Sequence, residues 1–482
     1  MLFNSYTFIA FFAVVFGLYW FVCNKNLKAQ NAVVLVASYF FYAWADWRFS
    51  FLLFGISFLN YFLGIYIANT EKSATRKLLL YIGLIQGIGG LAFFKYYNFF
   101  VTSIVEAFNL ISVSLSLKTL EIIIPLGISF FTFRTVSYLL DVEKGKIQPI
   151  TDWIAFFTYV SFFPSLLSGP IDKARTFVPQ LEKVRVFNYA QASDGMRQIL
   201  WGFFKKIVVA NNCAPITNDI FAHYETLPAS SLFLGALLYA FQIYADFSGY
   251  SDMAIGFSKL LGFNITKNFD YPFFAQSIPE YWRKWHISLT AWLTEYVFTP
   301  LSIAFRDYDK IGLILAIVIN FVIVGIWHGA NWTYVFFGFF HGLYFIPSIL
   351  NGTMNKKVKS DKQKLLPSFN ETINMARTFL IIMLTFVLFK ADSVTHAFDY
   401  YKHMVSTTLL SIPVVDFTAV AIVLFFSMAM FATEWLNRDK DHGLVLHQVQ
   451  VTYKRWSFYC LLILSLLFFG AFGENQFIYF QF

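Results

Sequence analysis

The chain has 482 residues, of which 58% are hydrophobic and only 13% are charged, and its formal net charge is +8. A soluble domain carries about 25% charged residues, so this composition excludes a soluble globule and indicates an integral membrane protein. The basic residues lie in short loops between apolar runs, where they orient a membrane protein, so the positive charge does not indicate a nucleic-acid partner.

Apolar segments of about 20 residues, the length that crosses a bilayer, recur along the whole chain. The long segments are 3–22, 49–69, 78–100, 231–245, 311–327, 332–350, 376–391, 416–436 and 456–473. Shorter or interrupted segments are 31–45, 121–140, 153–168, 196–212 and 287–304. The segment Met1–Trp20 has neither the positive region nor the cleavage site of a signal peptide, so we expect a retained first helix. The pattern predicts an all-α polytopic membrane protein with about 11 transmembrane helices plus re-entrant or interfacial helices.

Proline and glycine interrupt the apolar segments in the middle of the chain, at Pro125-Leu126-Gly127, Phe163-Pro164 and Gly169-Pro170. Irregular backbone is tolerated at membrane depth only where protein or a water-filled cavity shields it, so we expect this part of the chain to line a cavity. The sequence contains no internal repeat and no soluble domain. We therefore expect one membrane domain over residues 1–482.

Two aspartates, Asp246 and Asp252, lie within the apolar stretch 241–256. Ionisable groups in such a segment face a cavity or a counter-charge, and Arg283 and Lys284 are candidate counter-charges. Two interpretations stay open for these carboxylates. They form structural ion pairs that fix helix packing, or they line a substrate site.

Two histidines are flanked by tryptophan in this mostly apolar chain. His286 follows Arg283-Lys284-Trp285, and His328 comes directly after the aliphatic run 311–326 and Trp327. An imidazole beside a membrane-length helix is costly without a partner or water, so both residues indicate a chemical role. A structural histidine with satisfied hydrogen bonds remains the alternative for each. His341 would lie on another face of a continuous helix, and we expect a structural role for it.

Several other kinds of active site have no support in the sequence. The three cysteines have no CxxC spacing and no HxxxH pair is present, so we expect no metal site. The GxSxG elbow of a serine hydrolase and the glycine-rich phosphate loop are also missing. A histidine general base in a low-dielectric cavity, acting on a hydroxyl group, is the chemistry that remains.

Segments spread over the chain carry a resemblance to a known family. They are Pro125–Phe133, Ser161–Pro164, Ser168–Ile171, Tyr244–Asp252, Trp282–Leu289 and Trp327–Ala330, and Phe389–Ser393 extends the match. The chain resembles the membrane-bound O-acyltransferase family, in particular its bacterial branch for O-acetylation of alginate and peptidoglycan. The family often has Arg where Lys390 stands. The resemblance implies a ring of helices around a central funnel or tunnel, with re-entrant helices and a catalytic core over about 120–345.

The resemblance also implies which residues form the site. His328 stands at the family's catalytic histidine, and His286 stands at its second functional position. His328 would remove or relay the proton of an acceptor hydroxyl, and His286 would hydrogen-bond the acyl carbonyl or the second proton. Burial would keep both imidazoles neutral at pH 7. The residues that we expect to support them or to bind substrate are Asp246, Tyr250, Asp252, Arg283, Trp285, Trp327 and Asn331.

The resemblance implies transfer of an acyl group, in the simplest case acetyl, from a cytoplasmic thioester across the membrane for O-acetylation of an extracytoplasmic polysaccharide. We expect no bound cofactor, and the donor is acetyl-CoA or another acyl thioester. Expected partners are this donor, membrane lipid and an extracytoplasmic polysaccharide acetyltransferase, and the expected location is the bacterial inner membrane. The alternatives are D-alanyl transfer to a cell-wall polymer, a non-catalytic scaffold, and a transporter or flippase for a lipid-linked sugar.

Overall fold

The computed structural model describes the whole chain except residues 357–363, 446–450, 473–476 and 479–482. The described part is helical and contains no β-strand, which confirms the predicted all-α class. Its helices pack into two compact units. The first unit is Met1–Ser193 with Phe257–Thr266, and the second is Asp194–Gly256 with Lys267–Phe482. The single membrane domain over 1–482 stays a prediction.

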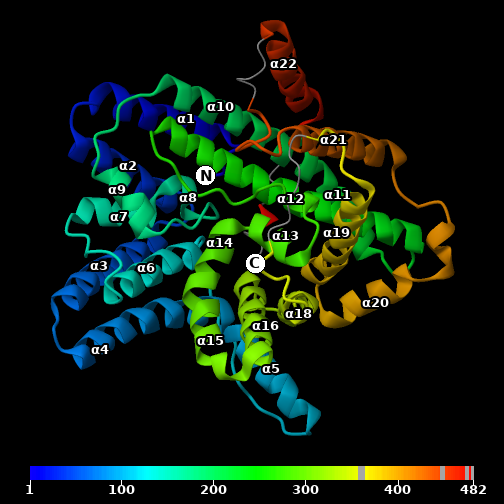
Figure 1. Cartoon of the computed structure of the whole chain (residues 1–482), viewed down its shortest axis with the longest axis horizontal. Helices are drawn as coiled ribbons and strands as arrows, with labels where there is room; N and C mark the ends of the chain where they lie inside the picture. The colour runs from blue at the N-terminus through cyan, green and yellow to red at the C-terminus, as the bar shows by residue number, and fades with distance from the viewer. Residues whose placement is uncertain (357–363, 446–450, 473–476, 479–482) are drawn as a thin grey trace. The chain divides into compact units, whose positions relative to one another are not determined.

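The first unit contains the N-terminal helices, which are blue to cyan in Figure 1. They are α1 (Tyr6–Gly17), α2 (Leu27–Ala43), α3 (Trp47–Asn69), α4 (Ser73–Leu84), α5 (Tyr97–Leu110), α6 (Ile128–Glu143), α7 (Trp153–Ser161), α8 (Phe163–Leu166) and α9 (Ala174–Leu181). Short π-helical stretches lie between them at η1 (Leu18–Val22), η2 (Ile85–Gly89) and η3 (Ala92–Tyr96). Aspartate side chains fix where α3 and α7 begin, because Asp46 accepts from the Arg48 amide and Asp152 accepts from the Ile154 amide.

The interrupted segments of the first unit fold into short helices joined by irregular backbone. Gly127 precedes α6 with a φ of 74°, and a Cβ there would lie 2.6 Å from the carbonyl oxygen of Leu166. Arg134, buried on α6, donates to the carbonyl oxygens of Val160 at 3.1 Å and of Ser165 at 3.1 Å. The guanidinium therefore satisfies carbonyl groups of α7 and α8 that short helices leave without backbone partners.

The second unit contains the remaining helices, and α10 (Tyr189–Phe203) and α12 (Ala229–Leu260) each include residues of both units. The others are α11 (Asn211–Ala222), α13 (Ile278–Lys284), α14 (Ile287–Leu293), α15 (Thr299–Ala304), α16 (Asp309–His328), α17 (Trp332–Tyr344), α18 (Ile346–Leu350), α19 (Phe369–Lys390), α20 (Val394–Met404), α21 (Phe417–Leu436) and α22 (Thr452–Phe469). Between them lie the π-helical η4 (Phe204–Ala210) and η6 (Thr294–Phe298) and the 3₁₀ turns η5 (Pro272–Phe274), η7 (Arg306–Tyr308) and η8 (Thr407–Leu410).

Glycines bring the backbones of α16 and α17 into direct contact. A Cβ added to Gly325 would lie 2.1 Å from the carbonyl oxygen of Tyr334, and one added to Gly338 would lie 2.1 Å from that of Phe321. Small residues at a helix interface allow this close approach in membranes, where packing holds helices together. The two helices form a tight hairpin with His328 at its turn.

Seven helical stretches of the described chain are long and apolar enough to cross a membrane. They are Trp47–Asn69, Ser73–Leu110, Ala229–Leu260, Arg306–His328, Trp332–Leu350, Phe369–Lys390 and Phe417–Leu436. Each contains most of one long apolar segment of the sequence. The segment 3–22 forms the shorter apolar helix Tyr6–Val22, and most of the segment 456–473 lies in α22, although residue 473 is outside the described chain. The count of about 11 spans and the ring around a tunnel stay predictions.

Candidate functional site

The indole of Trp327 contacts both predicted histidines. The ring centroids of His286 and Trp327 are 5.4 Å apart, and those of Trp327 and His328 are 4.9 Å apart. All three side chains are buried, with exposed fractions of 0%, 5% and 3% in chain order. The fold therefore brings together two histidines that the sequence places on separate elements.

His328 is the last residue of α16, where the chain leaves the helix. Gly329 is extended, and the Asn331 side chain accepts from the Thr333 amide at 3.0 Å to start α17. Gly329 is required here because a Cβ would lie 2.3 Å from the ring of Tyr334. The His328 ring packs edge-on against Phe389, with centroids 4.9 Å apart. The break between the two helices thus places the imidazole at a helix end among aromatic rings.

His286 joins α13 to α14 in a left-handed backbone conformation, with φ 43° and ψ 53°. This conformation costs an L-residue on the order of 1 kcal/mol and persists where the surroundings enforce it, often at functional sites. The ring packs edge-on against Phe247 of α12, with centroids 4.7 Å apart. Burial lowers the pKa of His286 to about 3, so its imidazole is neutral at pH 7. A neutral imidazole carries one donor and one acceptor nitrogen.

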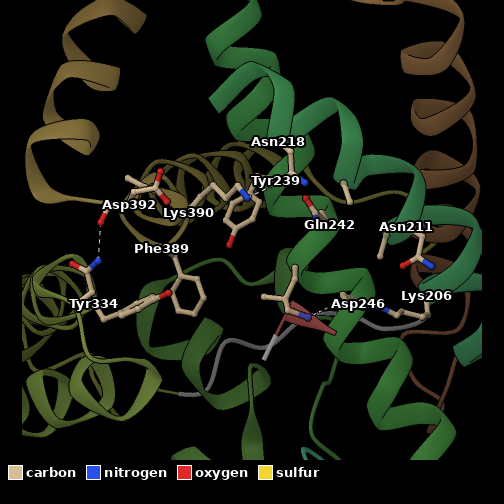
Figure 2. Close-up of a pocket in the computed structure, with 15 residues that line it drawn as sticks. Lys206, Asn211, Asn218, Tyr239, Gln242, Asp246, Tyr334, Phe389, Lys390 and Asp392 are labelled. Atoms are coloured by element: carbon tan, nitrogen blue, oxygen red, sulfur yellow. Dashed lines mark hydrogen bonds and ion pairs between the residues drawn. The ribbon is translucent and has the colours of Figure 1, made fainter. Parts of the chain in front are cut away.

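A polar cavity of about 320 Å³ lies next to the aromatic rings that pack on His328 (Figure 2). Phe389 and Tyr334 form part of its wall, and their ring centroids are 4.9 Å apart. The volume is at the lower end of the range for small-molecule sites, about 300–1,000 Å³. The polar side chains that line the cavity are Lys206, Asn211, Asn218, Tyr239, Gln242, Asp246, Asn331, Lys390 and Asp392.

The two aspartates of α12 pair with adjacent lysines of η4. Lys206 Nζ lies 2.5 Å from Asp246 Oδ1, and Lys205 Nζ lies 2.5 Å from Asp252 Oδ2. Asp246 also accepts from the amide of Ile478 at 2.8 Å. Asp246 and its lysine line the polar cavity (Figure 2), whereas Asp252 does not.

The prediction that Arg283 and Lys284 neutralise these aspartates is wrong. Lys284 Nζ lies 2.7 Å from the Glu280 carboxylate one helical turn earlier. Arg283 is exposed and donates to the carbonyl oxygen of Met354 at 3.0 Å. Residues so close in sequence to His286 point away from it because α13 turns their side chains to its other faces.

Trp285 and Tyr250 are buried among rings rather than in the cavity wall. Trp285 packs on Phe269, with centroids 5.0 Å apart, and on Phe386 at 5.5 Å. Tyr250 stacks on Phe477 at 4.6 Å. Both therefore contribute packing around the histidines and the α12 aspartates.

Lys390 lies at the end of α19 and reaches into the cavity (Figure 2). Its ammonium donates to the side-chain oxygen of Asn218 at 2.7 Å and lies 5.8 Å from the ring centroid of Tyr239. Within the described residues no carboxylate lies within 4 Å of it. An ammonium without a directly paired carboxylate keeps donors available for hydroxyl or anionic groups of a ligand, although the charge of Asp392 also acts on it across the cavity.

Other residues of the site were not predicted from the sequence, among them Lys205, Lys206, Asn218, Gln242 and Tyr334. The adjacent lysines had a usable signal, since two charges inside the apolar segment 196–212 require partners. The amides and Tyr334 had none, because ordinary helices carry them to the cavity. His341 accepts from the indole of Trp282 at 3.2 Å, as a structural histidine would. No group of three or more metal-binding side chains occurs in the described residues.

The sequence matches known proteins over most of its length. The model of the membrane-bound O-acyltransferase family, MBOAT, matches residues 148–389. A probable alginate O-acetylase, AlgI, of Pseudomonas syringae pv. tomato is 33% identical over 461 residues, which cover 92% of this chain and 84% of that protein. The peptidoglycan O-acetyltransferase of Helicobacter pylori is 31% identical over 478 residues, which cover 93% of this chain and 85% of that protein.

A third relative matches a smaller part of the chain. The teichoic acid D-alanyltransferase of Streptococcus thermophilus is 30% identical over 288 residues, which cover 55% of this chain and 68% of that protein. The family match includes His286, His328, the aspartates of α12 and the lysines of η4, and it ends one residue before Lys390. The chain belongs to the membrane-bound O-acyltransferase family and is a multi-pass membrane enzyme of that family.

Proposed function

We propose that the protein takes an acetyl group from a thioester donor and transfers it to a hydroxyl acceptor, for O-acetylation of an extracytoplasmic polysaccharide. The observation that carries the proposal is the buried pair His286 and His328, joined by Trp327 beside a polar cavity. A general base must lie within hydrogen-bond reach of the hydroxyl group that it deprotonates. The relatives named for alginate and peptidoglycan O-acetylation support an acetyl group and a polysaccharide acceptor.

His328 acts as the general base. It takes the proton of the acceptor hydroxyl while the hydroxyl oxygen attacks the thioester carbonyl carbon. The carbon–sulfur bond then breaks, and the proton passes from the imidazole to the leaving thiolate. His286 and the indole N–H of Trp327 are our candidate donors for the oxyanion of the tetrahedral intermediate. Arg283 is not part of this proposal, since its side chain is exposed.

The hydroxyl acceptor binds in the polar cavity. Its amides, lysines and tyrosines suit a hydroxylated group, and its volume of about 320 Å³ suits one small unit rather than a whole polymer. Acetyl-CoA or another acyl thioester supplies the group, no cofactor stays bound, and an extracytoplasmic acetyltransferase completes the transfer to polymer. The enzyme then works in the bacterial inner membrane. D-alanyl transfer is the second candidate, supported by the relative named for it.

The test combines His328→Ala with His223→Ala, an exposed histidine bonded to Asp219. Polymer O-acetylation is measured in cells that carry each variant as their sole copy, and acetyl-CoA cleavage is measured with purified protein. We expect His328→Ala to lose about 1,000-fold or more in rate at normal protein level, and His223→Ala to keep it. Unchanged acetylation with His328→Ala contradicts the proposal. A scaffold or a flippase predicts that the purified wild-type protein cleaves no thioester.

A further inference from the structure

A short paired stretch of backbone surrounds His286. The amide of Asp270 donates to the carbonyl oxygen of Lys284 at 2.9 Å, and the amide of Ile287 donates to the carbonyl oxygen of Asn268 at 2.9 Å. These bonds lay residues 268–270 alongside the link between α13 and α14. One bond precedes His286 in the chain and the other follows it, so the backbone on both sides of the histidine is fixed.

The Asn268 side chain adds a second set of bonds just after His286. Its Oδ1 accepts from Ser288 Oγ at 2.6 Å and from the Ser288 amide at 3.3 Å. Its Nδ2 donates to Ser251 Oγ on α12 at 3.3 Å. Asn268 is fully buried and Ser288 is 2% exposed, so the bonds form where water cannot replace them. The amide therefore ties the first turn of α14 to α12.

We propose that Asn268 is a positioning residue that holds His286 against Trp327 by clamping the first turn of α14. A non-glycine residue with a φ of 43° keeps that conformation only where neighbours enforce it, and Asn268 bonds both residues that follow His286. Without the side-chain clamp, the turn relaxes and the imidazole moves relative to the indole and His328. The inference rests on the function proposed above, in which His286 assists acyl transfer.

Asn268→Ala tests the clamp, because both backbone bonds remain when the side chain is removed. We expect kcat for acetyl transfer from acetyl-CoA to fall about 10-fold to 100-fold, because a displacement of the His286 imidazole by about 1 Å is enough to slow the reaction that much. The KM for the donor stays within about twofold. Asn268→Asp keeps the acceptor oxygen for Ser288 and restores most of kcat. The matched control is Asn31→Ala, a buried asparagine of the first unit that donates to the carbonyl oxygen of Leu181 at 2.9 Å. The control keeps the wild-type kcat per folded molecule.

Ser288→Ala keeps the test decisive where Asn268→Ala does not fold. It removes the 2.6 Å hydroxyl bond alone, and we expect kcat to fall about threefold to tenfold with the donor KM unchanged. A wild-type kcat in these variants contradicts the proposed role of Asn268. A fall in activity that only follows the folded fraction in a thermal scan contradicts it as well. Absence of acetyl transfer in the wild-type protein contradicts the proposed function instead, so the two failures are distinguishable.

Discussion

Both units bury cations, but they satisfy them with different partners. In the first unit, Arg134 donates to backbone carbonyl groups of two short helices. In the second unit, Lys206 pairs with Asp246 on the wall of a polar cavity that also holds Lys390. The Arg134 guanidinium satisfies backbone carbonyl groups, whereas Lys206 and Lys390 line a cavity that can hold a ligand. A buried charge in a membrane protein therefore does not mark a site unless a cavity lies beside it.

The distribution of histidines also distinguishes the two units. The seven histidines within the described residues all lie in the second unit, at positions 223, 286, 328, 341, 396, 403 and 442. Histidine is the side chain whose ordinary pKa lies near neutral pH. The second unit therefore contains both general-base candidates, His286 and His328.

The largest expected effect on stability comes from breaking the ion pair between Lys206 and Asp246 in the second unit. Lys206→Met leaves Asp246 buried without its counter-charge, and we expect the free energy of unfolding to fall by about 3 kcal/mol. Thermal unfolding of the purified protein in detergent measures the change. The double variant Lys206→Met with Asp246→Leu removes both charges and recovers most of the stability. A single variant as stable as the wild type would show that the cavity hydrates Asp246.

The matching change in the first unit has a smaller expected effect. Arg134→Met leaves the carbonyl oxygens of Val160 and Ser165 without a donor, which lowers the free energy of unfolding by about 2 kcal/mol. The same thermal scan measures it, and acyl transfer per folded molecule stays at the wild-type rate. A fall in kcat without a fall in stability would give Arg134 a part in catalysis and would break the comparison.

The pH dependence of stability tests the buried histidine of the second unit. The ordinary pKa of His286 is 6.5, and burial lowers it to about 3 in the folded state. As the pH falls from 6.5 toward 3, the unfolded chain takes up a proton that the folded site does not. The free energy of unfolding therefore falls, by up to about 1.4 kcal/mol per pH unit, and above pH 6.5 this contribution is constant. Denaturation midpoints at about pH 7 and about pH 5.5 measure it. His286→Gln reduces the slope, and an unchanged slope would contradict the assignment.

The smallest expected change in stability belongs to Lys390, whose ammonium bonds the Asn218 side chain and forms no direct ion pair with the described residues. Lys390→Gln alters the free energy of unfolding by less than about 0.5 kcal/mol but raises KM for the acceptor about threefold to tenfold. Lys390→Arg is the control, because the positive charge remains. Initial rates against acceptor concentration decide the matter, and equal KM values for all three proteins would remove Lys390 from the substrate site.

Local features of the sequence predicted much of the fold and part of the site. Hydropathy is a local property, so the seven long apolar segments that become membrane-length helices were visible directly. His286 and His328 were visible from their flanking residues, but their contact through Trp327 was not. The sequence suggested Arg283 and Lys284 as counter-charges of Asp246 and Asp252. In the structure these aspartates pair with Lys206 and Lys205 of η4, which lie earlier in the chain. Pairing of this kind depends on how distant helices pack, which hydropathy does not encode.

The direct backbone contact of α16 and α17 has a consequence for how the enzyme responds to its lipid. At Gly325 and Gly338 the backbones of the two helices meet so closely that one helix has little room to slide past the other. When the hydrocarbon layer becomes thinner or thicker, such a pair tilts as one body rather than sliding. We expect the turn that carries His328 to keep its geometry in bilayers of different thickness.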